Sequence, residues 1–320
     1  MKPSQLEILP NIEKRDNEKK SRWLTAVFLG LTIVPSIAFW FVSGLREKKI
    51  SLTNPIKSLN FSQIKLPEIE SSDRSVNLSR WAADRLPRLS GKWAIKVELL
   101  EEDFSWGVNV TDRFPAASLI KLPIAAAFYY QVEKGELTLG EVYLLKDKDK
   151  AAGAGSLSFY QAGTEFTLGQ LAALSLSQSD NTAIGVLRRR VGDSEINRLL
   201  LAWGMNNTSL EENLTTAEEV TLFFEKIYRN QILSSESSRK LLEELTNTAF
   251  EDRIPEGVPE GIRVAHKVGT DIEIASDAGI VFTPDKPFIL TILSQGVDTK
   301  EASEVFPDLV SDIYWILIGS

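Results

Sequence analysis

Residues 114–130 read FPAASLIKLPIAAAFYY, the most informative segment of this chain. Ser118 and Lys121 stand three residues apart, at the start of an apolar run that can bury one face of a helix. Side chains at this spacing are neighbours on a helix, so the lysine can reach back to the serine oxygen. Ser-x-x-Lys is expected about once by chance in a chain of this length. It also occurs at residues 62–65 and 237–240, but only the copy at Ser118 opens an apolar helix.

Two further short motifs follow the first one in order along the chain. They are Ser179-Asp180-Asn181 and Lys267-Val268-Gly269-Thr270. Ser-Asp-Asn is expected only about 0.05 times by chance in a chain of this length. The three motifs together, each in a plausible structural context, predict a serine acyl-transfer enzyme.

The chain offers lysine rather than histidine as the base that activates a serine. A serine hydroxyl is a poor nucleophile until a base takes its proton. The chain has one histidine, His266, and we expect that residue to be structural. Lys121 must then be neutral part of the time, which requires burial and a neighbouring cation such as Lys267. The plainer alternative is a helix-start serine followed by a surface lysine, and the two further motifs weigh against it.

The second motif directly precedes a predicted helix, residues 181–190. Its plainer interpretation is a helix cap made by Ser179 or Asp180. In the catalytic interpretation Ser179 passes a proton to the leaving nitrogen and Asn181 binds the substrate amide. Asp180 then braces the loop.

The third motif lies on a predicted strand. Lys267 and Thr270 can attract a substrate carboxylate, and Gly269 lets a substrate approach the strand edge closely. The backbone N–H groups of Ser118 and Thr270 are expected to form an oxyanion hole. The alternative is an exposed strand edge protected by a lysine.

Composition excludes several other classes of protein. The 320 residues are 43% hydrophobic and 25% charged, which is ordinary globular composition, and the net charge of −8 argues against a nucleic-acid partner. The absence of cysteine excludes disulfides and a thiol nucleophile, and a single histidine excludes a histidine-rich zinc site. The predicted mechanism needs no cofactor or metal.

An uncharged stretch near the N-terminus predicts a membrane anchor. Residues 23–45 carry no charge and are long enough, as a helix, to cross a hydrocarbon core of ~30 Å. The alternative is a cleaved signal peptide with Ser36-Ile37-Ala38 at the cleavage site. We expect a cytoplasmic tail (1–22), the anchor (23–45), a stalk (46–73) and an extracytoplasmic domain (74–320) on a single-pass protein of the cell membrane.

The pattern of the body predicts an α/β unit, of the α+β type, made from both ends of the domain. A helix from residue 75 precedes strands at 93–100 and 105–110. Residues 131–227 show mostly helical periodicity. Strands at 262–268, 272–282 and 288–294 and a helix at 300–318 complete the domain. The helical region is therefore an insertion.

The three motifs and their order resemble the class A β-lactamase and penicillin-binding superfamily. The resemblance covers roughly residues 75–320 and includes GAGSL at 153–157, LSQSDNTAIGVL and HKVGT. It implies a β-lactamase/transpeptidase-like fold, an antiparallel sheet flanked by helices with an inserted all-helical domain. The roles that it implies are acylated nucleophile for Ser118, base for Lys121, second-motif groups for Ser179 and Asn181, and carboxylate binding for Lys267 and Thr270.

Two departures from the family pattern concern deacylation and substrate binding. Class A β-lactamases carry a glutamate in an omega loop with the pattern Glu-x-x-Leu-Asn. Here Glu211 has threonine where that asparagine is expected, and the loop is short, so Glu211 is either a displaced equivalent or only a charged loop residue. Val268 replaces the hydroxyl residue usual after the third-motif lysine. Acylation is thus expected, and fast deacylation is in doubt.

Three functions follow from this reading. The first is a membrane-anchored serine hydrolase that opens β-lactams slowly. The second is a penicillin-binding D-Ala-D-Ala carboxypeptidase of the cell wall. The third is a catalytically silent binding module, which the intact set of catalytic groups weighs against.

Overall fold

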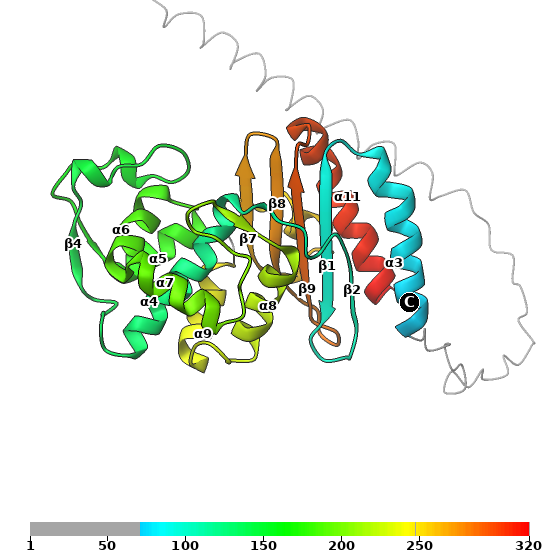
Figure 1. The fold of residues 1–320 in the computed structure, drawn as a ribbon, viewed down its shortest axis with the longest axis horizontal. Coiled ribbons are helices and arrows are strands. Elements are labelled where there is room, and N and C mark those ends of the chain that lie inside the picture. The colour runs from blue at the N-terminus through cyan, green and yellow to red at the C-terminus, as the bar shows by residue number, and fades with distance from the viewer. Residues whose placement is uncertain (1–70, 247, 320) are drawn as a thin grey trace, which may run out of the picture. The chain divides into compact units, whose positions relative to one another are not determined.

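Strands from both ends of the described chain form one antiparallel sheet. The computed structural model describes residues 71–246 and 248–319, and within them five strands pair in the order β2-β1-β9-β8-β7 (Figure 1). The strands are β1 (Lys92–Leu99), β2 (Ser105–Val108), β7 (Arg263–Asp271), β8 (Ile274–Phe282) and β9 (Phe288–Gln295). All pairs are antiparallel, and the central strands are buried on both faces. The predicted antiparallel sheet is therefore confirmed.

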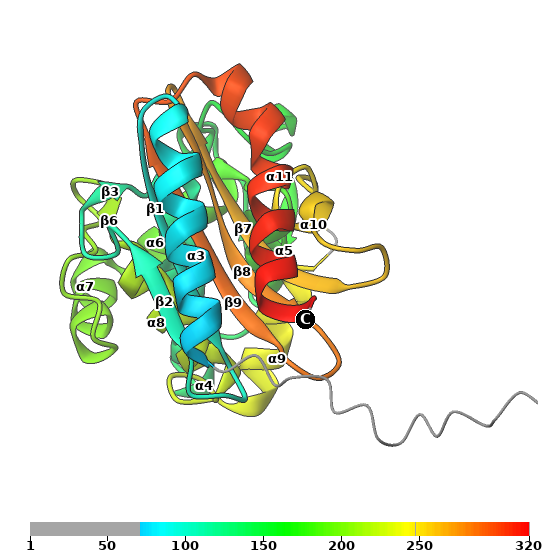
Figure 2. The ribbon, with the colours of Figure 1, turned by 90° about the vertical axis from the view of Figure 1, so that its right-hand side faces the viewer.

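Helices from the two ends of the domain cover one face of this sheet. The helices α3 (Ser71–Arg85) and α11 (Thr299–Ile318) lie side by side there, with the short α10 (Ile254–Gly257) near them (Figure 2). They bury an apolar layer that includes Leu78, Phe306 and Ile313 against Val97 and Leu290. Burial of such a layer is the main favourable contribution to folding.

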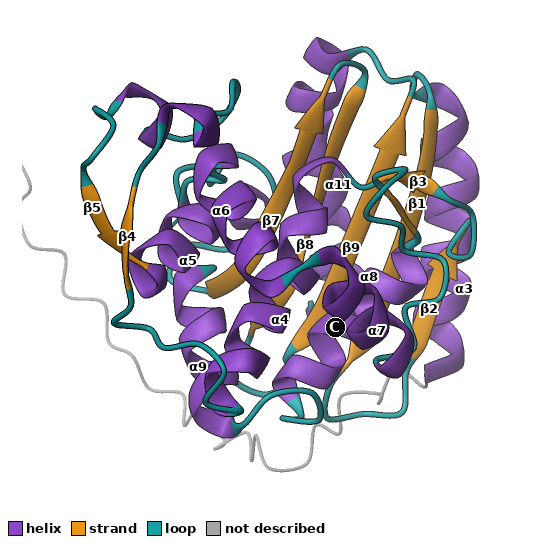
Figure 3. Cartoon of the chain, turned by 60° about the vertical axis from the view of Figure 1, so that its left-hand side comes forward, coloured by secondary structure: helices purple, strands orange, loops and turns teal. Residues whose placement is uncertain are grey.

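The other helices form the inserted helical region on the opposite side (Figure 3). They are α4 (Lys121–Glu133), α5 (Leu168–Ser177), α6 (Asn181–Val191), α7 (Asp193–Ala202), α8 (Ala217–Tyr228) and α9 (Ser235–Glu244). α4 contacts α5, α6, α7 and α9, and ten of its thirteen residues are buried. The sequence of α4 is a nearly continuous apolar run because neighbouring elements surround this helix on all sides. α8 packs directly on β1 and β9.

Several boundaries differ from the predicted ones. The first helix begins at Ser71 rather than 75, so the predicted stalk boundary at 73 falls inside it. The helical region extends to α9, beyond the predicted end at 227. Two short ladders were not predicted: β3 (Phe114–Pro115) with β6 (Leu214–Thr215), and β4 (Val142–Leu144) with β5 (Glu165–Thr167). Strands of two or three residues are too short to show the alternation by which a strand is recognised.

The predicted tail, membrane anchor and most of the stalk lie outside the described residues. Among the helices of residues 71–246 and 248–319, none is long and apolar enough to cross a membrane.

Candidate active site

Ser118 lies on a tight 3₁₀ turn that leads straight into α4. The turn, η3, spans Ala117–Ile120, so α4 begins at Lys121 and not at the serine itself. Ala117 has a positive φ of 46°, an uncommon conformation for a residue with a side chain. Such strain persists where the surrounding structure enforces it, often at functional sites. Here the N–H of Ala116 donates to the carbonyl of Asn213 at 2.8 Å, which connects the start of the turn to the loop before β6 (Leu214–Thr215).

Gly269 allows the Ser118 turn to approach strand β7. A β-carbon at Gly269 would lie 3.0 Å from the carbonyl oxygen of Ala116 and 3.3 Å from Leu119. Both distances are tighter than ordinary van der Waals contact. The structure thus gives the glycine a packing reason, whereas its expected contact with substrate stays a prediction.

The ammonium group of Lys121 forms hydrogen bonds to three side chains of the site. Its Nζ lies 2.7 Å from Ser118 Oγ, 3.2 Å from Ser179 Oγ and 2.7 Å from Asn181 Oδ1. A charged lysine donates three hydrogen bonds and accepts none, so these three acceptors satisfy it. A neutral lysine has a lone pair that can accept the Ser118 proton instead. The structure therefore brings together the first two motifs as predicted.

Burial makes the neutral form of Lys121 accessible. The residue is only 3% exposed, and this desolvation lowers its pKa to about 8, against the opposing attraction of the Asp180 carboxylate. The predicted effect of a neighbouring cation falls on the other lysine. Burial and then repulsion by Lys121 lower the pKa of Lys267 to about 7.

The Ser179-Asp180-Asn181 loop is held by its aspartate, as expected. Asp180 caps α6: Oδ1 accepts from the N–H of Ala183 and Oδ2 from that of Leu157, both at 2.8 Å. Gly155 packs so closely on Asp180 that a β-carbon there would lie 2.2 Å from its carboxylate. Ser179 has a positive φ of 56° and is buried, with its hydroxyl facing Lys121.

One of the two amide hydrogens of Asn181 is used in a hydrogen bond within the protein. Its Nδ2 donates to the carbonyl of Ala152 at 2.8 Å while its Oδ1 accepts from Lys121. An amide carries two N–H donors, so the second can reach a ligand in the cavity that Asn181 lines. This geometry is compatible with the predicted binding of a substrate amide.

Arg253 is a site residue that the sequence reasoning missed. Its guanidinium is buried, and Nη2 donates to Thr270 Oγ1 at 2.7 Å while Nη1 donates to the carbonyls of Ser276 at 2.5 Å and Gly269 at 3.3 Å. Lys267, the cation of the third motif, has its Nζ 3.3 Å from the carbonyl oxygen of Val268 and 5.9 Å from the centre of the Phe250 ring. Only the tertiary fold brings this arginine to strand β7, so no local motif marks it.

Two cavities meet at Ser118, and Ser118 and Thr270 line both. One, of about 420 Å³, is also lined by Lys121, Asn181 and Asn213. The other, of about 340 Å³, is lined by Ser179, Phe250, Asp252, Arg253 and Val268. A ligand can therefore place one part on each side of the nucleophile, with an anionic group towards Arg253.

The structure does not bring Glu211 into the site. The loop between α7 and β6 consists of residues 203–213. Directly after it, Leu214–Thr215 pairs with Phe114–Pro115. Glu211 is exposed and lines neither cavity, and neighbouring Glu212 pairs with Arg113 at the surface. Across the described part of the chain, no glutamate lines either cavity at Ser118.

Asn213 was also missed by the sequence reasoning. Its Oδ1 atom is buried without a hydrogen-bond partner, and the residue lines the larger of the two cavities at Ser118. Its positive φ of 52° follows from its place in the shortened loop. An unpaired buried oxygen beside a polar cavity is a natural contact for water or for a donor group of the substrate.

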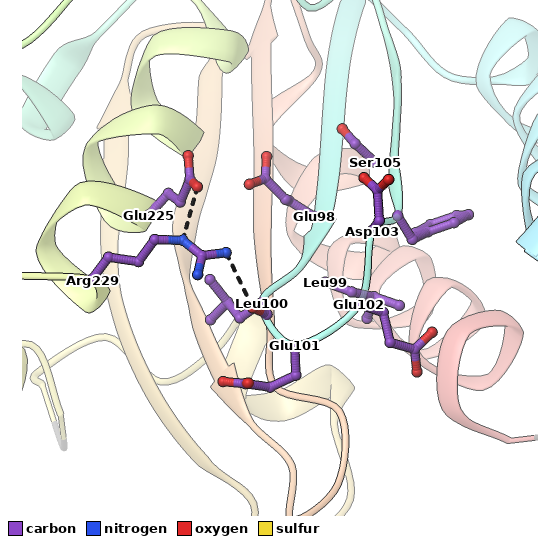
Figure 4. A pocket seen from close by; sticks show the side chains of 10 residues that line it. Glu98, Leu99, Leu100, Glu101, Glu102, Asp103, Ser105, Glu225 and Arg229 are labelled. Carbon is purple, nitrogen blue, oxygen red and sulfur yellow. Dashed lines mark hydrogen bonds and ion pairs between the residues drawn. The ribbon is translucent and has the colours of Figure 1, made fainter.

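A further cavity lies away from this chemistry. It has about 560 Å³ and sits at the turn between β1 and β2, where Glu98 and Glu225 face Arg229 (Figure 4). Burial, followed by the nearby Glu225, raises the pKa of Glu98. No serine–lysine pair lines it, so it offers no nucleophile of the kind found at Ser118.

Comparison with known proteins agrees with this geometry. The model of the beta-lactamase enzyme family matches residues 80–317. The chain belongs to this family. Among curated family members, beta-lactamase VEB-1 of Pseudomonas aeruginosa is 25% identical over 234 residues, covering 64% of this chain and 77% of the relative. Beta-lactamase 3 of Bacillus cereus is 26% identical over 228 residues, covering 66% and 71%.

Solved structures in the family include a protein called PBP-A. It superposes with a TM-score of 0.71 at 25% identity, covering 78% of this chain and 97% of PBP-A. A leucine-to-glutamate variant of PBP-A has been solved as an acyl-enzyme complex with penicillin G. The family and the site together identify this chain as a serine hydrolase of the β-lactamase type.

Proposed function

We propose that this protein is a penicillin-binding carboxypeptidase that acts on peptides ending in D-Ala-D-Ala. In this proposal β-lactams acylate Ser118 and leave it slowly. The observation that carries the proposal is the short loop 203–213, which leaves Glu211 exposed and supplies no glutamate to the cavities at Ser118. β-Lactam hydrolysis is the second candidate, and the match to the beta-lactamase family favours it.

Acylation in this proposal uses the hydrogen bonds of Lys121. The neutral amine takes the Ser118 proton, Oγ forms a bond to the carbonyl carbon, and the C–N bond to the leaving group breaks. Ser179 gives its proton to the leaving nitrogen and is reprotonated by Lys121, whose Nζ lies 3.2 Å from Ser179 Oγ. Lys121 ends neutral, and the products are an ester on Ser118 and a free amine. The N–H groups of Ser118 and Thr270 are proposed to bind the oxyanion.

Release of the acyl group requires water to attack this ester. A base near the ester has to take the water proton, and the neutral form of Lys121, whose Nζ lies 2.7 Å from Ser118 Oγ, is proposed as that base. General-base catalysis contributes about 10²- to 10⁴-fold. Because no glutamate lines the two cavities at Ser118 among the described residues, we expect this step to be slower than acylation.

The pKa of Lys121 sets the pH dependence of acylation. At saturating penicillin, the bound carboxylate keeps Lys267 protonated, so the first-order acylation rate follows the neutral fraction of Lys121. With a pKa of about 8 for Lys121, we expect the rate to rise about fivefold from pH 7 to pH 8 and to level off near pH 9. Stopped-flow measurement of acylation across this range is the check. A tenfold rise per unit that continues to pH 10 would mean an ordinary lysine.

Arg253 is expected to recognise the substrate carboxylate. In Arg253→Ala, penicillin is expected to acylate Ser118 about 10- to 100-fold less efficiently, mainly through a higher half-saturating concentration, since a charge-assisted hydrogen bond contributes about 1.5–3 kcal/mol. Acylation rates measured over a range of penicillin concentrations separate the two parameters. The exposed Arg239→Ala variant in α9 is the control. An unchanged half-saturating concentration would exclude this role.

Release of D-alanine tests the proposed substrate. The protein is incubated with a diacetylated tripeptide ending in D-Ala-D-Ala, and free D-alanine is measured with and without penicillin pretreatment. The proposal expects release that penicillin blocks. Release that is absent, together with rapid penicillin hydrolysis, would favour the β-lactamase alternative.

We also propose that residues 23–45 anchor the protein in the cell membrane with the enzyme domain on the extracytoplasmic side. The uncharged length of this segment supports the proposal. Membrane fractionation of cells that express the full chain, followed by protease treatment of intact spheroplasts, tests both the anchor and its orientation.

A further inference from the structure

A buried ion pair lies close to Arg253, where the substrate carboxylate is expected to bind. His266 on β7 and Asp277 on β8 are both fully buried, and Nδ1 of the histidine lies 2.9 Å from each carboxylate oxygen. Gly279, opposite His266, lets the two strands lie close together here, because a β-carbon there would lie 2.3 Å from the carbonyl oxygen of Ala265 and 2.6 Å from the β-carbon of His266. A buried carboxylate is retained only when it is paired and hydrogen-bonded, so Asp277 needs these contacts.

Asp277 also fixes the segment that carries Arg253. Its Oδ2 accepts from the backbone N–H of Ile254 at 3.1 Å, at the first residue of α10. Arg253 is the preceding residue, and its guanidinium stacks over Phe306 at 5.6 Å. The Asp277 carboxylate therefore helps to fix the position of the backbone at Arg253, and with it the region that the arginine side chain can reach.

Asp277 is moreover the shared counter-charge for the cations of this region. Its charge opposes the lowering of the pKa of Lys267 and of Arg253 that burial causes. Burial disfavours the charged form of His266, but the charges and hydrogen bonds of Asp277 and Glu251 together outweigh it and raise the pKa of His266 to about 9. Glu251 and Thr248 face the other ring nitrogen, Nε2, at 3.5 and 3.4 Å.

We propose that Asp277, paired with His266, is a positioning residue for recognition of the substrate carboxylate. It does not touch the substrate. It holds Arg253 against Thr270 and provides a negative charge that favours the cationic forms of Lys267 and Arg253 in a buried place. This inference rests on the proposed function, in which a carboxylate-bearing acyl donor reaches Ser118.

The test compares two acyl donors that differ only in the carboxylate, penicillin G and its methyl ester. In Asp277→Asn, which keeps the size of the side chain but removes its charge, we expect acylation by penicillin G to become about 10- to 100-fold less efficient. Acylation by the methyl ester is expected to change less than about twofold, since the ester cannot pair with Arg253. A merely structural role would reduce acylation by both donors equally.

A double-mutant cycle gives a second, independent readout. Because Asp277 is proposed to act largely through Arg253, the variant that combines Asp277→Asn with Arg253→Ala is expected to lose less preference for penicillin G than the sum of the two single losses. Asp277→Glu, which keeps the charge, is expected to restore part of the preference for penicillin G. Additive losses, or no rescue by glutamate, would overturn the proposal.

Controls distinguish loss of stability, failure of the proposed function and failure of the role of Asp277. Where Asp277→Asn unfolds, His266→Asn/Asp277→Asn removes both charges together, and the same loss of preference is expected. Failure of both donors to acylate the wild-type protein would refute the proposed function. Acylation of the wild type with an unchanged preference in the folded Asp277 variants would refute only the role of Asp277.

Discussion

The Ser118→Ala variant is expected to form no covalent adduct with penicillin. Removal of a nucleophile that acts with its base typically costs about 10⁵-fold or more in rate, so the adduct should fall below detection. Alanine leaves the turn at residues 117–120 intact, and Lys121 keeps Ser179 and Asn181 as acceptors. Intact mass spectrometry of the wild-type and variant proteins, after identical exposure to penicillin, is the measurement.

The chain contains a matched control for this experiment. Ser237 and Lys240 repeat the spacing of Ser118 and Lys121, but they lie on α9, where Lys240 pairs with Glu244. Ser237→Ala is expected to acylate like the wild type. An adduct of full yield in Ser118→Ala would assign the nucleophile to another residue and remove the basis of the mechanism.

Lys121→Met is expected to slow acylation about 10³-fold while penicillin still binds. Methionine fills nearly the same buried space but cannot take the Ser118 proton, and a general base contributes about 10²- to 10⁴-fold. The loss should therefore appear in the first-order rate at saturating penicillin and not in the half-saturating concentration. Stopped-flow or quenched mass measurements at several concentrations separate the two.

Lys240→Met supplies the corresponding control, because it removes a half-exposed lysine from the Ser-x-x-Lys motif at residues 237–240. Its acylation rate should match that of the wild type. A Lys121→Met variant that is folded and acylates within tenfold of the wild type would assign the base to a different group, with Lys267 as the next residue to change.

The groups around Lys121 could be predicted from the sequence because each lies in a short, local motif. Ser118 and Lys121 are adjacent on one turn, and Asn181 opens the helix that Asp180 caps. Their meeting follows from the packing of α4 against α6, two helices with strong apolar patterns. The strands could be predicted from their local patterns, whereas the antiparallel sheet was implied by the family resemblance.

Arg253 and Asn213 could not be predicted because their roles exist only in the folded chain. Arg253 reaches Thr270 through a segment whose position depends on Asp277, and Asn213 is placed by the pairing of β3 with β6. Neither residue stands in a motif. The match of Glu211 to a Glu-x-x-Leu pattern shows the opposite case, since the pattern is present but the side chain is exposed at the surface.

Penicillin is expected to acylate Ser118 readily, and the acyl group is expected to leave slowly; a time course of intact mass measures both steps. The protein is mixed with a small excess of penicillin, the free drug is removed, and the adduct and hydrolysed drug are followed. We expect a burst of one penicillin per protein, followed by an adduct that persists after the drug is gone. An adduct that disappears quickly, with hydrolysed penicillin accumulating far beyond one per protein, would contradict this expectation.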